Sequence, residues 1–399
     1  MSRRSSIAAD LALALVSLAV SGLGAELYLR HYRPVHGVLY RLHPRFLHTL
    51  VPGARRLFVH QPEDGGGSLL VTVNGDGFLG PELRPHQAGL PRVVVYGDSF
   101  VAGEFSPVTE RFATQLARRL SDPGRPEVEA VNAGVVGYGP DQEALRLEDE
   151  IGPLKPDLVV VAVFAGNDFG DLLRDKIFRL DEQGQLQPRA PRLGEVLRKE
   201  FAHAERQAQG SRLLQGLQDL WNRPQAGPRR DSLLPEGGFP YLLQRRGREY
   251  DLSTHDGSDT VDHLLGDPYD ADVSLDPEAE SSRYKTALMA QVLRHMADTA
   301  RRHETPIVFV FIPSAFDLGE GFEHPDTSRF PAYRPFALTD ALAGPASAHG
   351  LVVLDLAPVF GAALPQRLYF RRDEHWNAAG QTLAAEHVAA LVKARGLLK

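Results

Sequence analysis

The sequence predicts an α/β protein, a three-layer α/β/α sandwich with a central parallel sheet. Two observations predict this fold: short continuous apolar runs recur along the chain, and segments with helical spacing of apolar residues separate them. Strands that are buried on both faces, as in a parallel sheet, show unbroken apolar runs. Right-handed crossovers then place helices on both faces of the sheet. The predicted strands lie within 92–99, 127–134, 157–168, 306–313 and 351–358, and the predicted helices span 110–120, 141–151, 285–303 and 377–395.

Composition excludes several classes of protein. Hydrophobic residues make up 43% and charged residues 24% of the 399 residues, so the chain can bury a sizeable core. The net charge of −7 argues against a protein that coats nucleic acid, which needs a basic face. The chain has no cysteine, which excludes disulfides, thiolate-bound metals and thiol catalysis. No spacing of ligand residues indicates a metal site, and we expect no cofactor.

The N-terminal segment, residues 1–30, is predicted to lie outside the fold. The apolar run 11–25 is shorter than the roughly 20 residues that span a bilayer, but 7–29 is long enough if Asp10 and Glu26 lie near the headgroups. A membrane anchor and a cleaved signal peptide both fit this pattern. Either one places the globular part outside the cytoplasmic membrane, although basic residues on both sides of the segment weaken the prediction of its orientation.

The remaining chain divides into two predicted parts. Residues 31–90 form a strand-rich lead-in, and 91–399 form the α/β domain. That domain contains an insertion at about 172–282, because a hundred residues between two sheet strands is too long for an ordinary connection. It contains a polar-apolar helical segment over 193–221, a Pro/Gly/Arg-rich piece near 224–238 and an acidic run over 251–280. The insertion is a candidate lid, substrate wall or partly mobile segment.

Polar residues follow the predicted strands, at the edge where parallel sheets bind ligands. They are Ser99, the segment 132–137, Asn167 and, after the last strand, His375. Each has an ordinary structural explanation: a helix cap for Ser99, turns for the glycines, an Asx turn for Asn167 and a surface position for His375. Together they supply a nucleophile, a base with carboxylates nearby and two hydrogen-bond donors for an oxyanion. The combination favours a catalytic site.

Four sequence blocks now show a resemblance. VVVYGDSF, VNAGVVGYG, FAGND and DEHWNAAG resemble the ordered blocks of the SGNH/GDSL hydrolases, and the resemblance covers 92–170 and 285–396. The lead-in and the N-terminal apolar segment resemble those of the membrane-tethered bacterial members. The resemblance implies a flavodoxin-like SGNH hydrolase fold and a serine esterase.

The resemblance also implies roles for individual residues. Ser99 matches the nucleophile, His375 the base that takes its proton, and Asp373 the carboxylate that orients the imidazole. The backbone N–H groups of Ser99 and Gly137 and the side-chain amide of Asn167 match the oxyanion hole.

The acidic residue departs from the commoner family pattern. That pattern places the acid three residues before the histidine, where this chain has Arg372, so Asp373 at two residues before takes its place and Glu374 and Asp355 are the fallback carboxylates. The Asp-x-His-Trp string also resembles the alginate-type O-acetylating enzymes, which carry the blocks in a permuted order. We expect Trp376 to pack in the core and Asn377 to cap the last helix.

The predicted function is hydrolysis of short acyl esters, above all acetyl esters on cell-surface carbohydrate. Acyl transfer to a polysaccharide hydroxyl by the same residues is the alternative, and a catalytically silent scaffold is a further one. Gly134, Gly137 and Gly139 occur in the wrong order for a dinucleotide-binding loop, which argues against nucleotide binding. The expected partners are therefore an ester substrate and, through the N-terminal helix, a membrane, with no nucleic acid.

Overall fold

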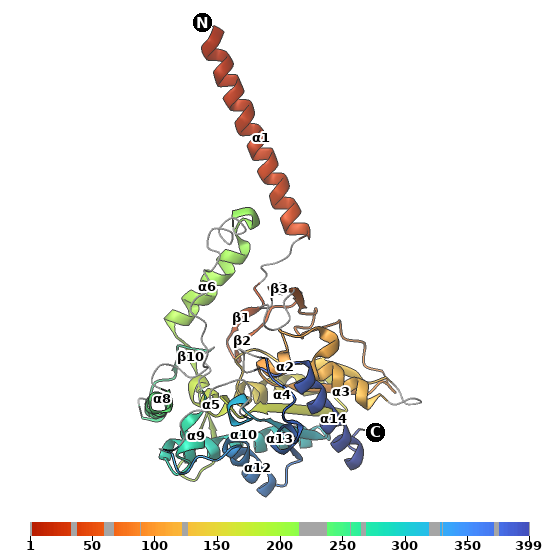
Figure 1. The fold of residues 1–399 in the computed structure, drawn as a ribbon, viewed down its shortest axis with the longest axis vertical. Coiled ribbons are helices and arrows are strands. Elements are labelled where there is room, and N and C mark those ends of the chain that lie inside the picture. Colours follow the sequence, from red (N-terminus) through yellow and green to blue (C-terminus); the bar gives the residue numbers. More distant parts are fainter. Residues whose placement is uncertain are drawn as a thin grey trace.

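The computed structural model describes most of the chain, namely residues 2–32, 38–59, 68–87, 89–121, 127–214, 238–255, 257–264, 269–318, 328, 330–370 and 375–398. Figure 1 shows one α/β body, from which the N-terminal helix α1 (Ser2–Tyr32) extends.

A five-stranded parallel sheet forms the centre of the protein. Its order is β13-β12-β7-β5-β6, and every pair of neighbours runs parallel. In chain order this is 2-1-3-4-5, the flavodoxin-like arrangement, whose strand order reverses between the first and third strands. The predicted fold class and all five predicted strands are confirmed. The strands are β5 (Arg92–Tyr96), β6 (Glu129–Asn132), β7 (Leu158–Phe164), β12 (Ile307–Ile312) and β13 (Val353–Asp355).

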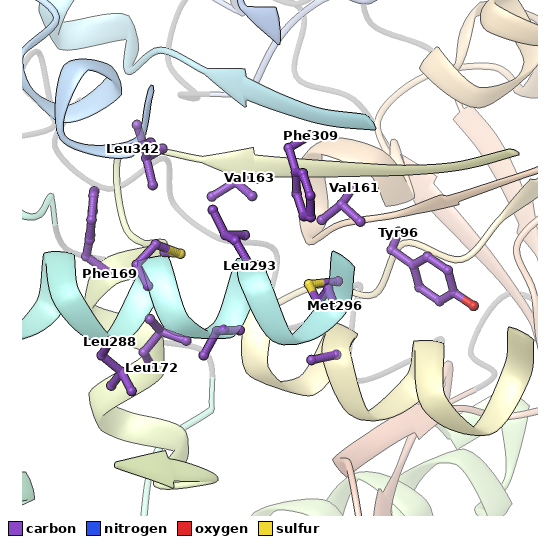
Figure 2. Packing of buried hydrophobic residues seen from close by; sticks show 14 of the residues in the cluster. Tyr96, Val161, Val163, Phe169, Leu172, Leu288, Leu293, Met296, Phe309 and Leu342 are labelled. Atoms are coloured by element: carbon purple, nitrogen blue, oxygen red, sulfur yellow. The ribbon is translucent and has the colours of Figure 1, made fainter. Parts of the chain in front are cut away.

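Helices cover both faces of this sheet because alternate residues of each strand point to opposite sides. In β7, Val161 and Val163 belong to one core and Val160 and Ala162 to the other. Figure 2 shows the first core, in which Leu293 and Met296 of α10 lie against side chains of the sheet. The first face carries α4 (Pro140–Leu154), α5 (Asp168–Asp175), α10 (Glu280–Arg302) and α12 (Ala337–Ala348); the second carries α2 (Ser99–Ala102), α3 (Phe112–Leu120), α13 (Ala357–Ala363) and α14 (Ala378–Arg395).

The lead-in forms two antiparallel pairs. They are β1 (Tyr40–His43) with β2 (Leu47–Leu50), and β3 (Arg55–Val59) with β4 (Ser68–Thr72). Leu39, Leu50 and Val71 of this region form a small third core with Tyr138, whose hydroxyl donates to the backbone oxygen of His48 at 2.6 Å. The lead-in is therefore packed against the loop that follows β6, next to the predicted oxyanion residues.

The insertion contains secondary structure of its own. The predicted helical pattern forms α6 (Glu195–Gln209), while residues 215–221 at its end and the Pro/Gly/Arg-rich piece near 224–237 lie outside the described residues. Lys285 of α10 binds Asp270 at 2.9 Å and Asp272 at 2.8 Å, which fixes the end of the insertion to the core. The other elements of the insertion are β8 (Phe178–Leu180), β9 (Leu186–Pro188), β10 (Arg192–Leu193), α8 (Gly238–Thr254), β11 (Thr260–Val261) and α9 (Ala271–Leu275). The boundaries predicted for the domains stay predictions.

Helix α1 is long and apolar enough to cross a membrane. Its candidate span, Ala9–Leu29, has 21 residues, a mean hydropathy of 1.7 and no buried part. Such a helix fits a membrane anchor or a signal sequence.

Candidate active site

The site lies where the strand order of the sheet reverses. Ser99 follows β5 and Asn167 follows β7, and these two strands are neighbours. Asp98 begins α2: its Oδ1 accepts the N–H of Phe100 at 2.9 Å, and its Oδ2 lies 3.3 Å from the Ser99 Oγ. This cap fixes Ser99 as the first residue of a short helix at the carboxyl edge of the sheet.

His375 lies directly against Ser99. Its Nε2 is 2.6 Å from the Ser99 Oγ, although 276 residues separate the two positions in the chain. The imidazole lies beside the ring of Phe100, with centroids 5.0 Å apart. The next residue, Trp376, is 1% exposed and donates from Nε1 to the Phe100 oxygen at 2.9 Å. The predicted packing role of Trp376 is confirmed, and it holds the histidine next to the serine.

The helix that follows starts as predicted. The Asn377 side chain accepts the N–H groups of Ala379 at 2.8 Å and Gly380 at 3.2 Å, so it caps α14. This cap and the buried indole fix the backbone on the C-terminal side of His375.

The predicted oxyanion donors have no other hydrogen-bond partner among the described residues. Asn167 is 5% exposed and occupies the N-cap position of α5, yet its side chain makes no cap hydrogen bond, and its Oδ1 is buried without a partner among the described residues. Gly137 has φ +74°, a backbone conformation that favours glycine. Within the described part of the chain, the N–H groups of Ser99 and Gly137 donate to no other group. All three donors are therefore available to a ligand.

The loop that contains Gly137 is pressed against α2. A Cβ on Gly134 would lie 2.2 Å from the backbone nitrogen of Ala102, so only glycine fits there. The Asn132 Nδ2 donates to the Val101 oxygen at 2.9 Å, and its Oδ1 accepts the Gly134 N–H at 3.0 Å. These contacts set the position of the loop relative to Ser99.

Carboxyl groups are buried behind the nucleophile. Glu143 is 1% exposed and Asp168 is fully buried, and the Asp168 Oδ2 accepts the Phe164 N–H at 2.7 Å. Burial and the charge of Asp98 raise the pKa of Glu143 and that of Asp168 well above their ordinary values. The sequence did not predict that Glu143 and Asp168 are buried, because the residues around them in the chain do not indicate burial.

A group of aromatic and polar side chains, here called the margin, lies beside His375; it consists of Phe58, Phe105, Glu104 and Tyr40. The Phe105 ring lies 5.4 Å from the His375 ring and 6.0 Å from that of Phe58 in β3, and both phenylalanines are half-buried. Glu104, 4% exposed, accepts a hydrogen bond from the Tyr40 hydroxyl. Burial raises the pKa of Glu104, and the bond from Tyr40 and the charges of Arg56 and Arg111 oppose that shift. Only the position of Glu104 five residues after Ser99 could have drawn attention to this margin.

The predicted acid of the triad, Asp373, lies outside the described residues, as do Arg372 and Glu374. The other fallback carboxylate, Asp355, accepts the N–H of Ala357 at 2.8 Å and so occupies a helix-start position. Among the described residues, no group of three or more His, Asp or Glu side chains is arranged to hold a metal ion.

Ser99 and His375 thus meet at the edge of a parallel sheet, an arrangement that a serine hydrolase would use. The chain belongs to the GDSL-like Lipase/Acylhydrolase family, whose model matches residues 95–383, and it is accordingly an enzyme that acts on ester bonds. The matched range begins within β5 and contains Ser99, Asn167 and His375. No curated protein matches the chain.

The chain also resembles solved structures that share little sequence with it. A lipase/acylhydrolase from Enterococcus faecalis is 15% identical with a TM-score of 0.36, and the match covers 77% of this chain and 97% of that one. An acetylxylan esterase mutant from Geobacillus stearothermophilus is 14% identical with a TM-score of 0.37, over 77% of this chain and 96% of that one. Likenesses of this strength say nothing about the substrate of the present chain.

Proposed function

We propose that the protein is a serine esterase in which Ser99 is the nucleophile and His375 the general base. The observation that supports this most is the 2.6 Å separation of the Ser99 Oγ and the His375 Nε2, which is within the reach needed for proton transfer. Asp373 is proposed to orient the imidazole and to stabilise its charged form.

The reaction proceeds in two displacements. The Ser99 Oγ attacks the ester carbonyl carbon while the His375 Nε2 takes the hydroxyl proton. The negative charge that develops on the carbonyl oxygen is met by the N–H groups of Ser99 and Gly137 and by the Asn167 amide. His375 then gives the proton to the departing alcohol, which leaves an acyl-serine. Water, activated by the same imidazole, releases the acid and restores Ser99.

We propose a short acyl group on a carbohydrate as the substrate class. The half-buried rings of Phe105 and Phe58 can pack against the C–H face of a sugar. The cationic group of Arg56 lies 4.9 Å from the centre of the Phe58 ring and adds a polar edge. Helix α1 is proposed to anchor the enzyme with this site outside the cytoplasmic membrane, next to surface glycans.

The chemistry is tested on the full chain in detergent with a short-chain aryl acetate. Ser99→Ala and His375→Ala should each abolish turnover while the unfolding transition stays in place, and a fluorophosphonate should label the native chain at Ser99 only. Longer acyl chains should react more slowly. Absence of labelling in the folded native chain would refute the serine mechanism. Labelling without hydrolysis, together with acetylated product on adding a glycan acceptor, would show transfer instead.

The carbohydrate proposal is tested with Phe58→Ala. Loss of one aromatic contact of about 1 kcal/mol should raise KM for an acetylated oligosaccharide about fivefold and leave kcat/KM for the small aryl acetate unchanged. Leu70→Ala is the matched control, because Leu70 is an exposed apolar residue of β4, the partner strand of β3. Equal effects of the two substitutions on both substrates would contradict a sugar site at Phe58.

A further inference from the structure

The far end of the insertion contacts helix α1. The carboxylate of Glu26 accepts hydrogen bonds from the Ser211 Oγ at 2.8 Å, the Arg212 N–H at 3.0 Å and the Leu213 N–H at 2.9 Å. The Leu213 Cδ2 also lies 4.0 Å from the place that a Cβ on Gly22 would take. Residues 211–214 are called the insertion tip below. In Figure 1, α6 extends from the body toward the lower end of α1.

The position of Glu26 in the apolar helix makes this contact informative. Glu26 lies within the candidate span Ala9–Leu29. An ionisable side chain in such a span is expensive unless partners satisfy it. The insertion tip supplies three donors to the carboxylate, and hydrogen bonds to a charged acceptor are the stronger kind. The contact therefore compensates the charge that interrupts the apolar helix.

Exposed leucines surround the contact. Leu214, at the end of the tip, is 62% exposed, and on α1 Leu23 and Leu27 on either side of Glu26 are 61% and 59% exposed. Apolar side chains this exposed and this close together mark a surface that another apolar phase covers. Because Leu23 and Leu27 belong to a candidate membrane span, the covering phase that fits them is lipid. Leu214 directly follows Leu213, which contacts α1 at Gly22.

We propose that the insertion tip is a second membrane contact: it binds α1 at Glu26 and places Leu214 in the lipid surface. The proposal rests on α1 remaining in the membrane, which is part of the proposed function. The two contacts fix the distance and the orientation of the α/β body relative to the bilayer, which a single contact through α1 would not do. The role of the insertion is then to orient the catalytic domain toward surface-bound esters.

The absence of native cysteine permits a direct test with single labels. The full chain carrying Leu214→Cys, labelled with the environment-sensitive dye NBD, is reconstituted in phosphatidylcholine/phosphatidylglycerol vesicles with and without brominated acyl chains. Leu18→Cys, at a residue of α1 that is 73% exposed, reports insertion of the anchor. Leu252→Cys, at a residue of α8 that is 47% exposed, is the control on the body. Labels at 18 and 214 should be quenched at least twofold, and the label at 252 should not.

The outcomes separate the two levels of the proposal. Quenching at 18 without quenching at 214 overturns the tip contact and leaves the anchor intact. No quenching at 18 refutes the anchor and, with it, the tip contact. Glu26→Ala should at least halve the quenching at 214 and leave that at 18 unchanged, whereas Glu26→Gln, which keeps an acceptor oxygen, should preserve part of it. Hydrolysis of the aryl acetate should be the same in all of these variants, so a failed esterase assay stays a separate result.

A cross-linking pair tests the contact without lipid. Gly22→Cys with Leu213→Cys should form an intramolecular disulfide under copper phenanthroline, because those positions are in contact. Gly24→Cys with Leu213→Cys is the matched control, since nothing lies within 4 Å of a Cβ at Gly24. Equal cross-linking of both pairs would contradict a defined contact between the tip and α1.

Discussion

Replacing Asn167 by alanine separates catalysis from helix capping more sharply than any other substitution at this site. Asn167 occupies the N-cap of α5, where an asparagine side chain usually accepts a backbone N–H and contributes about 1 kcal/mol to stability. Here the side chain makes no such bond, and its buried Oδ1 has no partner among the described residues. The amide is thus unused by the fold and available to the substrate.

The expected result follows from these contacts. Loss of one oxyanion donor removes about 3–4 kcal/mol of transition-state stabilisation, so kcat should fall about 100- to 1,000-fold. The free energy of unfolding should change by less than about 1 kcal/mol, because no cap bond is lost. The fall should appear in kcat more than in KM, since the charge on the carbonyl oxygen develops only in the transition state.

The assay combines steady-state hydrolysis of an aryl acetate with urea unfolding of the same preparations. Asn167→Asp keeps the shape of the side chain but removes the amide donor, so it should lose as much kcat as the alanine variant. Native kcat together with a stability loss of about 1 kcal/mol would refute the reasoning, because that is the signature of a helix cap.

Two further predictions concern stability and activity together. Gly137→Ala and Gly350→Ala both place a side chain at positive φ, +74° and +70°, and should each cost about 1–2 kcal/mol of stability. Only Gly137→Ala should lower kcat, since Gly350 precedes β13 at the opposite edge of the sheet from the site; equal kcat values would contradict the oxyanion role of Gly137. Burial raises the pKa of Asp317 from 3.8 to about 6, so this group stabilises the fold below pH 4 and loses about 3 kcal/mol of that contribution as the pH rises to 6. Asp317→Asn should flatten this part of the profile of unfolding free energy against pH, and an unchanged slope would show that Asp317 titrates normally.

The predicted site residues that the structure describes share one property: each follows a strand of the parallel sheet or adjoins the last helix. Ser99 and Asn167 follow β5 and β7, and a parallel sheet brings such positions to one edge whatever lies between them in the chain. The sequence could place His375 and Ser99 at the same edge of the sheet, but it could not predict that their side chains lie 2.6 Å apart. Continuous apolar runs gave the strands, since a strand buried on both faces has few alternatives.

The contacts that the sequence did not predict join elements that are far apart in the chain, and no repeating pattern of residues relates those elements. Tyr40 reaches Glu104 only because the lead-in packs on the loop after β6, and no local pattern encodes that approach. β2 was missed because it is short and begins at Leu47, whose φ is +65°. The burial of Glu143 likewise follows from where α4 meets the sheet, since an acidic residue in a helix predicts a solvated face.

These unpredicted contacts have a common consequence for the site. The parallel sheet positions Ser99, Asn167 and His375, and this arrangement accounts for ester chemistry but favours no particular alcohol or acid. The ring that is proposed to contact the alcohol part of the substrate, Phe58 of β3, belongs to the lead-in. The lead-in directly follows α1 in the chain, so the segment that joins the enzyme to the proposed membrane anchor also supplies the proposed sugar contact. A change in how the lead-in packs against the α/β body should therefore alter substrate preference more than it alters the reaction itself.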